Sequence, residues 1–259
     1  MILIESTDGQ RSGKGPFNVS KCFHLSITRK TRPIQTSYTM DNQLVSKVQD
    51  HKYLGVTIDK NLKWSTHCQK ISSKARSTLG IVRRSLHSTS QDVKSRAYQA
   101  LVRPQLEYAS AAWNPHTKKD SDILQKVQNA AARFATSDYD RFSSVSAMQE
   151  RLGWDLLSVR HLHSQVCIFY KIHFGLVNIS FPSFVEKPKR LSSRSSHPLQ
   201  YLRVQCNKDS FFFSFYPRMI YVWNSLSPGV VGAPSYDLFK SSSLGEVRTL
   251  APPVWSTRI

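Results

Sequence analysis

Apolar and polar residues alternate through residues 17–59, and this two-residue period predicts a small β unit. The segment FHLSIT (23–28) alternates as a half-buried strand does. In YTMDNQLV (38–45), the pair Asp41-Asn42 interrupts the apolar run and can supply a hairpin turn. We expect a further single strand at HKYLGVTI (51–58) and antiparallel pairing throughout the unit.

The period changes to that of a helix at Trp64. Apolar residues then recur at steps of three and four and form one stripe over about six turns: Trp64, Cys68, Ile71, Ala75, Leu79, Val82 and Leu86. The break STSQD (88–92) offers Ser90 as the N-cap of a second helix. Its expected apolar stripe comprises Val93, Ala97, Leu101, Leu106, Ala109 and Trp113.

Proline and glycine divide the helical region that follows. Pro104 should kink or split the second helix because proline lacks a backbone N–H, and Asn114-Pro115 should end it. A third helix is expected from Asp120 or Ser121, with an apolar stripe of Ile123, Leu124, Val127, Ala131 and Phe134. We also expect a short helix at 143–152 and a longer one at 155–174 that ends at Gly175.

Beyond Gly175 the periodicity weakens. Proline, serine and basic residues in 181–198 indicate a surface loop. Pro217 should open a helix that runs to Leu226, and 236–243 should form a last short helix.

These patterns predict an α+β fold that is mainly α-helical. We divide the chain into a disordered segment (1–16), the antiparallel β unit (17–59), a basic helical segment (60–116), a further helical region (117–176) and a loop-rich C-terminal region with short helices (177–259).

The charge of the chain indicates a polyanionic partner. There are 36 Lys and Arg residues against 17 Asp and Glu, which gives a formal net charge of +19. Nucleic acid is the first candidate, an anionic membrane surface is the second, and a basic protein with no such partner is the third reading. The sequence shows neither an eighteen-residue apolar run nor a signal-peptide core, so we expect no membrane span and an intracellular location.

Basic residues are most concentrated in 60–103, where ten Lys and Arg residues, Lys60 among them, face the single acid Asp92. An ordinary solvated helical face mixes both signs, so this excess predicts contacts with a phosphate backbone, which supply affinity and little sequence discrimination. The alternative is a solvated helical bundle in a basic chain. The candidate binding residues are Lys63, Lys70, Lys74, Arg76, Arg83, Arg84, Lys94, Arg96 and Arg103.

The residue patterns of catalytic and metal sites are weak. The four cysteines are far apart and no Cys/His cluster has zinc spacing, so structural thiols and surface imidazoles are expected. Asp138 and Asp140 flank Tyr139 between helices, where a loop salt bridge or a cap explains them. Most aromatic residues fall on helical apolar faces, which favours core packing over base stacking. We assign no catalytic residue, no metal and no cofactor.

Several blocks of the chain, taken together, resemble reverse transcriptases of non-LTR retrotransposons of the LINE-like, jockey and CR1 types. They cover roughly residues 17–240 and read FNVSKC (17–22), YLGVTIDKNLKWSTHCQKI (53–71), AYQALVRPQLEYASAAWNP (97–115), LQKVQNAAARF (124–134), LGWDLLSVRHLHSQVCIFYKI (152–172) and SFYPRMIYVWNSLSP (214–228).

The resemblance implies a role for each block. FNVSKC corresponds to the end of the polymerase palm, and 38–58 corresponds to the primer grip, with Tyr53, Leu54 and Gly55 in its second strand. The basic helices from Trp64 correspond to a thumb that holds the template–primer duplex. The region from about residue 120 corresponds to a downstream segment thought to bind the element's RNA.

The chain also departs from the family. The family's active site carries a Tyr/Phe-x-Asp-Asp motif upstream of FNVSKC, whereas this sequence has no Asp-Asp pair. The fingers and most of the palm are missing too, so we expect a truncated transposable-element fragment that is inactive alone. Mg²⁺ is expected only for a complete polymerase, and a separate palm and fingers segment is a candidate partner.

Three functional readings follow. The first is a fragment that retains binding to RNA or an RNA–DNA duplex, in the nucleus or cytoplasm by family resemblance. The second is a relic or a protein-interaction module without a binding role. The third is an enzyme that works in trans with a separate palm.

Overall fold

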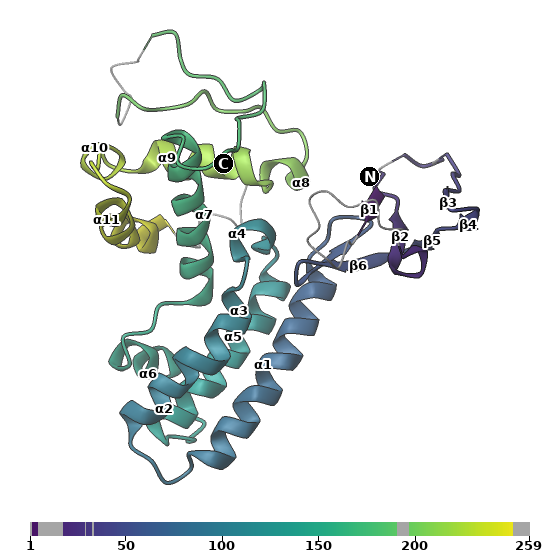
Figure 1. Cartoon of the computed structure of the whole chain (residues 1–259). Helices are drawn as coiled ribbons and strands as arrows, with labels where there is room; N and C mark the ends of the chain where they lie inside the picture. The colour runs from purple at the N-terminus through teal and green to yellow at the C-terminus, as the bar shows by residue number, and fades with distance from the viewer. Residues whose placement is uncertain (1, 5–17, 29, 33, 191–196, 251–259) are drawn as a thin grey trace. The chain divides into compact units, whose positions relative to one another are not determined.

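The computed structural model describes residues 2–4, 18–28, 30–32, 34–190 and 197–250 (Figure 1). The chain divides into two compact units, Met1–Ile71 and Ser72–Ile259, and the boundary falls within the first long helix, α1 (Ser65–Ser85). The described residues are mainly helical, with small sheets confined to the first unit, as the α+β prediction expected. The predicted boundaries at 59/60, 116/117 and 176/177 do not coincide with the boundary between the units.

The first unit contains a three-stranded sheet in the order β1-β2-β5. Strand β1 (Ile2–Ile4) is antiparallel to β2 (Cys22–Leu25), and β2 is parallel to β5 (Ser46–Val48). A 3₁₀ turn, η1 (Val19–Lys21), precedes β2. The expectation of purely antiparallel pairing was therefore wrong. Residues 1–16 were expected to be disordered, but Ile2–Ile4 pair with a strand, while residues 5–16 lie outside the described residues.

Two hairpins complete this unit. Strands β3 (Thr39–Met40) and β4 (Gln43–Leu44) are joined by Asp41 (φ 48°) and Asn42 (φ 59°), which confirms the predicted turn. Positive φ at both positions is what a type I′ hairpin turn requires.

The second hairpin corrects the prediction of one strand at 51–58. Strands β6 (Asp50–Tyr53) and β7 (Val56–Asp59) are antiparallel, and Leu54 (φ 45°) and Gly55 (φ 84°) form the turn between them. The primer-grip assignment placed Leu54 and Gly55 in a strand. They form a turn instead. The sequence concealed this turn because only the glycine adopts positive φ without a steric penalty, and the leucine signals no turn.

Helix α1 buries the predicted stripe, with Cys68, Ala75, Leu79 and Val82 all in the core. The hydroxyl of Ser90 caps α2 (Gln91–Ala97) by accepting the Val93 N–H, as predicted. A π-helical turn, η2 (Tyr98–Val102), then leads into α3 (Arg103–Glu107), and α4 (Ser110–Trp113) ends before Asn114-Pro115.

Pro104 does not split the second helix: α2, η2 and α3 are continuous from Gln91 to Glu107, and the break comes at Tyr108 and Ala109, where Ala109 has a φ of 52°. The Arg103 N–H donates to the carbonyl of Tyr98, five residues back, instead of to the carbonyl four residues back. This wider π turn comes directly before Pro104, which has no N–H to donate. The expected apolar stripe was wrong at Val93 and Leu101, which are 43% and 54% exposed, and at Ala109, which is exposed and has a left-handed φ of 52°. Every fourth residue is buried instead: Lys94, Tyr98, Val102 and Leu106. In a regular α-helix, residues four apart differ by about 40° in direction, so these four side chains would not share one face. The π turn has more residues per turn and offsets this rotation.

The next three helices follow the predicted order. Helix α5 (Lys118–Thr136) begins earlier than expected because the Thr117 hydroxyl caps it by accepting the Asp120 N–H. Helix α6 (Val145–Arg151) is short, and α7 (Leu157–His173) ends at Gly175 as predicted. Gly175 has a φ of 68°, and the next N–H, from Leu176, reaches back to the carbonyl of Lys171 at 2.8 Å.

Four helices follow the loop: α8 (Asp209–Phe212), α9 (Phe215–Ser225), α10 (Pro228–Val231) and α11 (Tyr236–Leu250). The described part of 181–198 contains no helix or strand, in agreement with the predicted loop. Pro217 is the third residue of α9 rather than the first, because the helix already begins at Phe215. The last helix extends to Leu250, well beyond the predicted 236–243.

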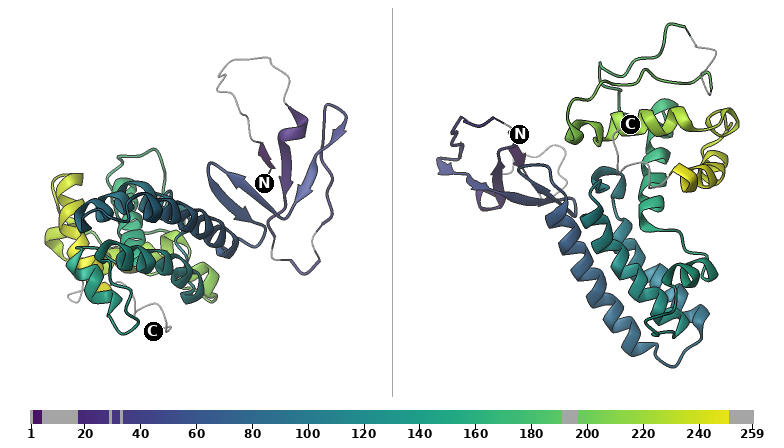
Figure 2. Two further views of the ribbon diagram at one scale, coloured as in Figure 1. Left: turned by 90° about the horizontal axis from the view of Figure 1, so that it is seen from below. Right: turned by 180° about the vertical axis from the view of Figure 1, so that it is seen from behind.

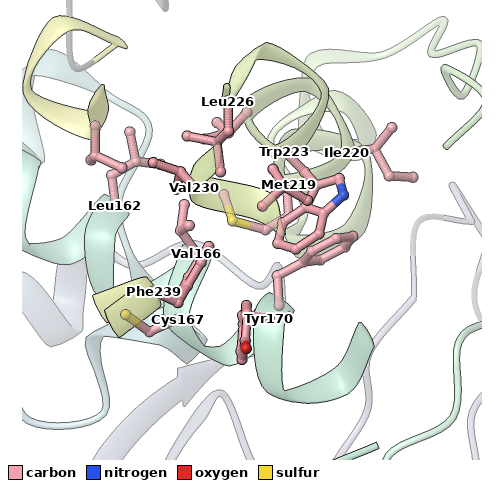
Figure 3. Close-up of a cluster of buried hydrophobic side chains, with 14 of the residues drawn as sticks. Leu162, Val166, Cys167, Tyr170, Met219, Ile220, Trp223, Leu226, Val230 and Phe239 are labelled. Atoms are coloured by element: carbon pink, nitrogen blue, oxygen red, sulfur yellow. The ribbon is translucent and has the colours of Figure 1, made fainter. Parts of the chain in front are cut away.

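One hydrophobic core of the second unit joins α7 to α9, α10 and α11 (Figure 3). Tyr170 stacks on Phe239 with ring centres 4.1 Å apart, and its hydroxyl donates to the carbonyl of Ala233. Trp223 is 1% exposed, and its indole N–H donates to Leu199. This packing crosses the predicted 176/177 boundary, so the segments on its two sides depend on each other for burial.

Away from that core, α1, the α2–α3 segment and α5 run alongside one another (Figures 1 and 2). Side chains tie them together: Ser72 donates to the carbonyl of Ile123, Gln105 to Thr78, and Tyr98 to the Gln128 side chain. Among the helices in the described ranges, none has the combined length and apolar character needed to cross a bilayer.

Candidate nucleic-acid interface

The part of α1 in the second unit carries four exposed cations, Lys74, Arg76, Arg83 and Arg84. At 100° per residue, Arg76 and Arg83 project from one flank of the buried stripe, Lys74 projects from the other, and Arg84 lies on the outer face. Within the described part of the chain, no carboxylate comes within 4.0 Å of any of the four. Their charge is therefore left facing solvent.

The structure places the other predicted cations differently. Arg96 forms an exposed ion pair with Asp92 at 3.0 Å. Arg103 is half-buried, 3.8 Å from Glu107, whose carboxylate is also bound by Arg160. Lys94 is only 5% exposed.

Lys63 and Lys70 belong to the first unit. Lys63 is exposed just before α1, and Lys70 forms an ion pair with Asp50 at 3.1 Å. The nine predicted residues consequently do not form one set of free cations.

The primer-grip residues also lie in the first unit. Tyr53 is half-buried at the end of β6, and Leu54 is 70% exposed at the turn. Gly55 follows it in the same turn.

Arg83, Arg84 and Lys94 line an open cavity of about 750 Å³, which we call the basic hollow. None of the described lining residues is acidic. The hollow is formed by the end of α1, by α2, and by the end of α5 with its following loop: Gly80, Arg83, Arg84, His87, Lys94, Phe134, Ser137 and Tyr139. Sequence reasoning identified the three cations and missed the wall contributed by α5.

Lys94 forms part of that wall. Its ammonium donates to the Ser137 hydroxyl at 2.7 Å and lies 5.3 Å from the centre of the Phe134 ring. Ser137 is the left-handed C-cap of α5 (φ 56°), so the cation also lies at the negative end of that helix. Lys94 adds positive potential to the hollow while its ammonium is hydrogen-bonded to Ser137 and packed against Phe134.

The loop after α5 holds Tyr139 in place. The side chain of Asp138 accepts the N–H of Asp140, and the side chain of Asp140 accepts the N–H of Phe142. Arg133 donates to the carbonyls of Asp140 and Ser143. Neither explanation offered for the aspartates is observed: both form side-chain turns within the loop, Ser137 and Ser144 cap the flanking helices, and neither aspartate forms an ion pair with a described residue.

The guanidinium carbon of Arg83 lies 5.7 Å from the centre of the Tyr139 ring, within cation–π range. The ring is 56% exposed, so it does not serve the core. An aromatic surface therefore stands beside Arg83 and Arg84. The sequence signal for this placement was only the Asp-Tyr-Asp turn after a helix.

The histidines correct another expectation, since His24, His67, His161 and His197 are buried rather than on the surface. The His161 Nε2 donates to the carbonyl of Leu106 at 2.9 Å, and burial lowers its pKa to about 4. The His67 Nδ1 accepts the Thr57 N–H. Burial is the main cause that lowers the pKa of His67 to about 4, and the nearby positive charge of Lys70 adds to it. Both imidazoles are neutral and structural at pH 7.

A thiol and an imidazole meet on α7, but they do not form an activated pair. The Cys167 Sγ lies 3.7 Å from His163 Nε2, and burial raises the pKa of the thiol, which keeps it protonated. Across the described ranges, no three His, Cys, Asp or Glu residues are grouped as metal ligands.

Comparison with known proteins gives one distant relationship. Over 134 residues the chain is 26% identical to the RNA-directed DNA polymerase from mobile element jockey of Drosophila funebris. The matched region covers 48% of this chain and 14% of that polymerase, so the chain spans about a seventh of its relative. No family model and no solved structure matches the chain. The similarity connects the protein distantly to retrotransposon reverse transcriptases.

Proposed function

We propose that this chain is a nucleic-acid-binding segment related to non-LTR retrotransposon reverse transcriptases. In this proposal, the second-unit part of α1 contacts the phosphate backbone of RNA or an RNA–DNA duplex, as a polymerase thumb does. The observation that carries the proposal is the set of four exposed cations without a nearby described carboxylate: Lys74, Arg76, Arg83 and Arg84.

Three other exposed cations of the same unit are paired within the protein, whereas others, such as Lys119 and Lys126, have no carboxylate within 4.0 Å among the described residues. Arg96 is paired with Asp92, Lys118 with Asp122 and Arg248 with Asp155. A cation paired within its own protein has less to gain from a phosphate than an unpaired one. The imbalance on α1 therefore favours an external polyanion, which releases its counterions on binding.

The proposal extends to the β6–β7 hairpin as a primer-grip-like element. Its contact would be made by the exposed turn at Leu54 and Gly55 rather than by a strand. A photoreactive residue in place of Leu54 should cross-link to the 3′-terminal nucleotide of a primer. Cross-links distributed along the duplex would contradict this assignment.

The proposal concerns binding and assigns no catalytic step. Glu107 and Asp92 are engaged in ion pairs with Arg160 and Arg96, and Asp138 and Asp140 accept backbone N–H groups within their own loop. The full activity of the jockey polymerase is not transferred to a chain that spans 14% of it. Primer extension by this protein with Mg²⁺ would contradict the expectation that it is inactive alone.

A salt series with a blunt RNA–DNA hybrid tests the binding. Affinity should fall as salt rises, with a log–log slope that decreases by about 0.7 to 0.9 for each phosphate contact removed. Gln substitutions at Lys74, Arg76, Arg83 and Arg84 should therefore flatten the slope stepwise. The matched control is Lys118→Gln, which removes an exposed but paired cation.

Two results would contradict the proposal. One is the absence of hybrid binding at low salt by folded protein. The other is an equal change of slope for Lys118→Gln and the α1 variants. Either result would favour the reading of a relic or a protein-interaction module.

A further inference from the structure

We propose that the basic hollow binds one unpaired nucleotide, with its base against Tyr139 and its phosphate at Arg83 and Arg84. This inference rests on the proposed function and adds a preference for single-stranded nucleic acid at one end of α1. Its basis is the combination, around one cavity, of an exposed ring and two exposed guanidinium groups with no described carboxylate within 4.0 Å.

The size and lining of the hollow fit such a ligand. Its volume of about 750 Å³ lies in the range of small-molecule sites. Basic side chains from α1 stand on one side, and the end of α5 with its aromatic loop stands on the other. A nucleotide has the same two parts, an anionic phosphate and a flat aromatic base.

Tyr139 has the features of a stacking platform. It is 56% exposed, and its loop is held by the Asp138 and Asp140 turns and by Arg133. A ring fixed before binding loses little entropy when a base stacks on it. Stacking on an aromatic side chain accepts any base, so this contact would be tolerant of sequence.

The phosphate contact falls to the neighbouring arginines. Arg83 and Arg84 are exposed, and no described carboxylate lies within 4.0 Å of either. Lys94 also lines the hollow, where its ammonium donates one hydrogen bond to Ser137 and raises the local positive potential. The planar guanidinium groups can bind phosphate oxygens in a bidentate manner.

The aromatic contact distinguishes this site from ordinary backbone binding. Within a duplex each base is covered by its neighbours, so its face cannot reach a protein ring. The α1 cations can hold a duplex by its phosphates along its length, whereas Tyr139 can engage only an unpaired base or the exposed face of a terminal pair. We therefore expect a hybrid with a single-stranded overhang to bind more tightly than a blunt hybrid.

Fluorescence anisotropy with two matched RNA–DNA hybrids tests the inference. One hybrid is blunt, and the other carries an overhang of about four unpaired nucleotides, the small end of single-strand site sizes. Tyr139→Ala should weaken binding of the overhang hybrid about tenfold, from the loss of one stacked base, and leave blunt-hybrid binding unchanged. Tyr139→Phe should behave as wild type because it keeps the ring.

Phe142→Ala provides the matched control. Phe142 is on the same loop, 80% exposed and next to the Arg141 guanidinium, but it does not line the hollow. Its removal should leave the overhang preference intact. Because Tyr139 and Phe142 are both exposed, circular dichroism should show the two alanine variants folded like the wild type.

The possible failures are distinguishable. If blunt hybrids bind with the expected salt dependence but the overhang does not increase affinity, the nucleotide site is wrong and the proposed function stands. The same conclusion follows if Tyr139→Ala and Phe142→Ala reduce the preference for the overhang hybrid equally. If neither hybrid binds at low salt, the proposed function itself fails. Adenosine monophosphate should compete only weakly with the overhang hybrid. If it bound more tightly than the overhang hybrid, the proposal of a strand-bound nucleotide would be wrong, and the hollow would be a site for a free nucleotide.

Discussion

The ammonium of Lys94 donates a 2.7 Å hydrogen bond to the hydroxyl of Ser137 and so connects α2 to the end of α5. Lys94 occupies a position on the buried face of its helix that a hydrophobic residue would normally fill. Its charge is accommodated by the hydroxyl, the Phe134 ring and the C-terminal end of α5. This cation therefore serves the fold, unlike those exposed on α1.

Lys94→Met should leave the salt dependence of hybrid binding unchanged. The methionine keeps the length and apolar stem while removing a buried charge that is hydrogen-bonded to Ser137 and therefore should not contact phosphate directly. Arg84→Met removes an exposed cation and should decrease the log–log slope by about 0.7 to 0.9. Filter binding over a salt series measures both, and equal slope changes would show that Lys94 contacts phosphate directly.

Glu107→Gln should lower the free energy of unfolding by about 1 to 3 kcal/mol. Its half-buried carboxylate accepts hydrogen bonds from Arg160, raises the pKa of that arginine, and lies 3.8 Å from Arg103. The neutral amide would leave two arginines together without their acid.

Asp122→Asn is the control for this prediction. Asp122 pairs with Lys118 on the surface, where the two side chains are 48% and 87% exposed, so the substitution should cost less than about 0.5 kcal/mol. Urea unfolding compares the two variants. Equal costs would mean that the Glu107 cluster is screened as fully as a surface pair.

Gly175→Ala should destabilise the protein by about 1 kcal/mol. Gly175 has a φ of 68° at the end of α7, and an added Cβ would meet no atom within 4 Å, so the cost is one of backbone strain alone. Gly229→Ala in α10 also has free space but no positive φ, and it should be neutral or slightly stabilising. Thermal melts of both variants isolate the cost of backbone strain, because neither added Cβ is crowded.

Protonation of His161 should destabilise the fold as the pH falls from about 6.5 toward 4. Burial lowers its pKa from 6.5 to about 4 in the folded state, so between these values the unfolded chain binds more protons. The contribution is complete above pH 6.5 and reaches a loss on the order of 3 kcal/mol near pH 4.

His161→Gln should therefore flatten the pH dependence of stability, since its amide can still donate to the carbonyl of Leu106. Urea midpoints at pH 7 and pH 5 compare the variant with the wild type. An unchanged difference between these two midpoints would show that His161 does not titrate in this window.

Features that depend on a few neighbouring residues were predictable from the sequence. The stripe from Cys68 to Val82 set the face and length of α1, because helical periodicity is local. The Asp41-Asn42 turn, the Ser90 cap and the Gly175 stop were predictable for the same reason. The concentration of cations on α1 was also legible, because charge can be counted along the chain.

The tertiary structure decided which of those cations are free and what stands beside them. Lys94 is buried because α5 covers it, and Tyr139 lies by Arg83 because the end of α5 adjoins the end of α1. The burial of His161 and the face presented by Tyr98 and Val102 likewise depend on neighbouring helices. The sequence by itself determined the helices and their charge, whereas a hollow with an aromatic wall exists only once segments distant in the chain have packed together.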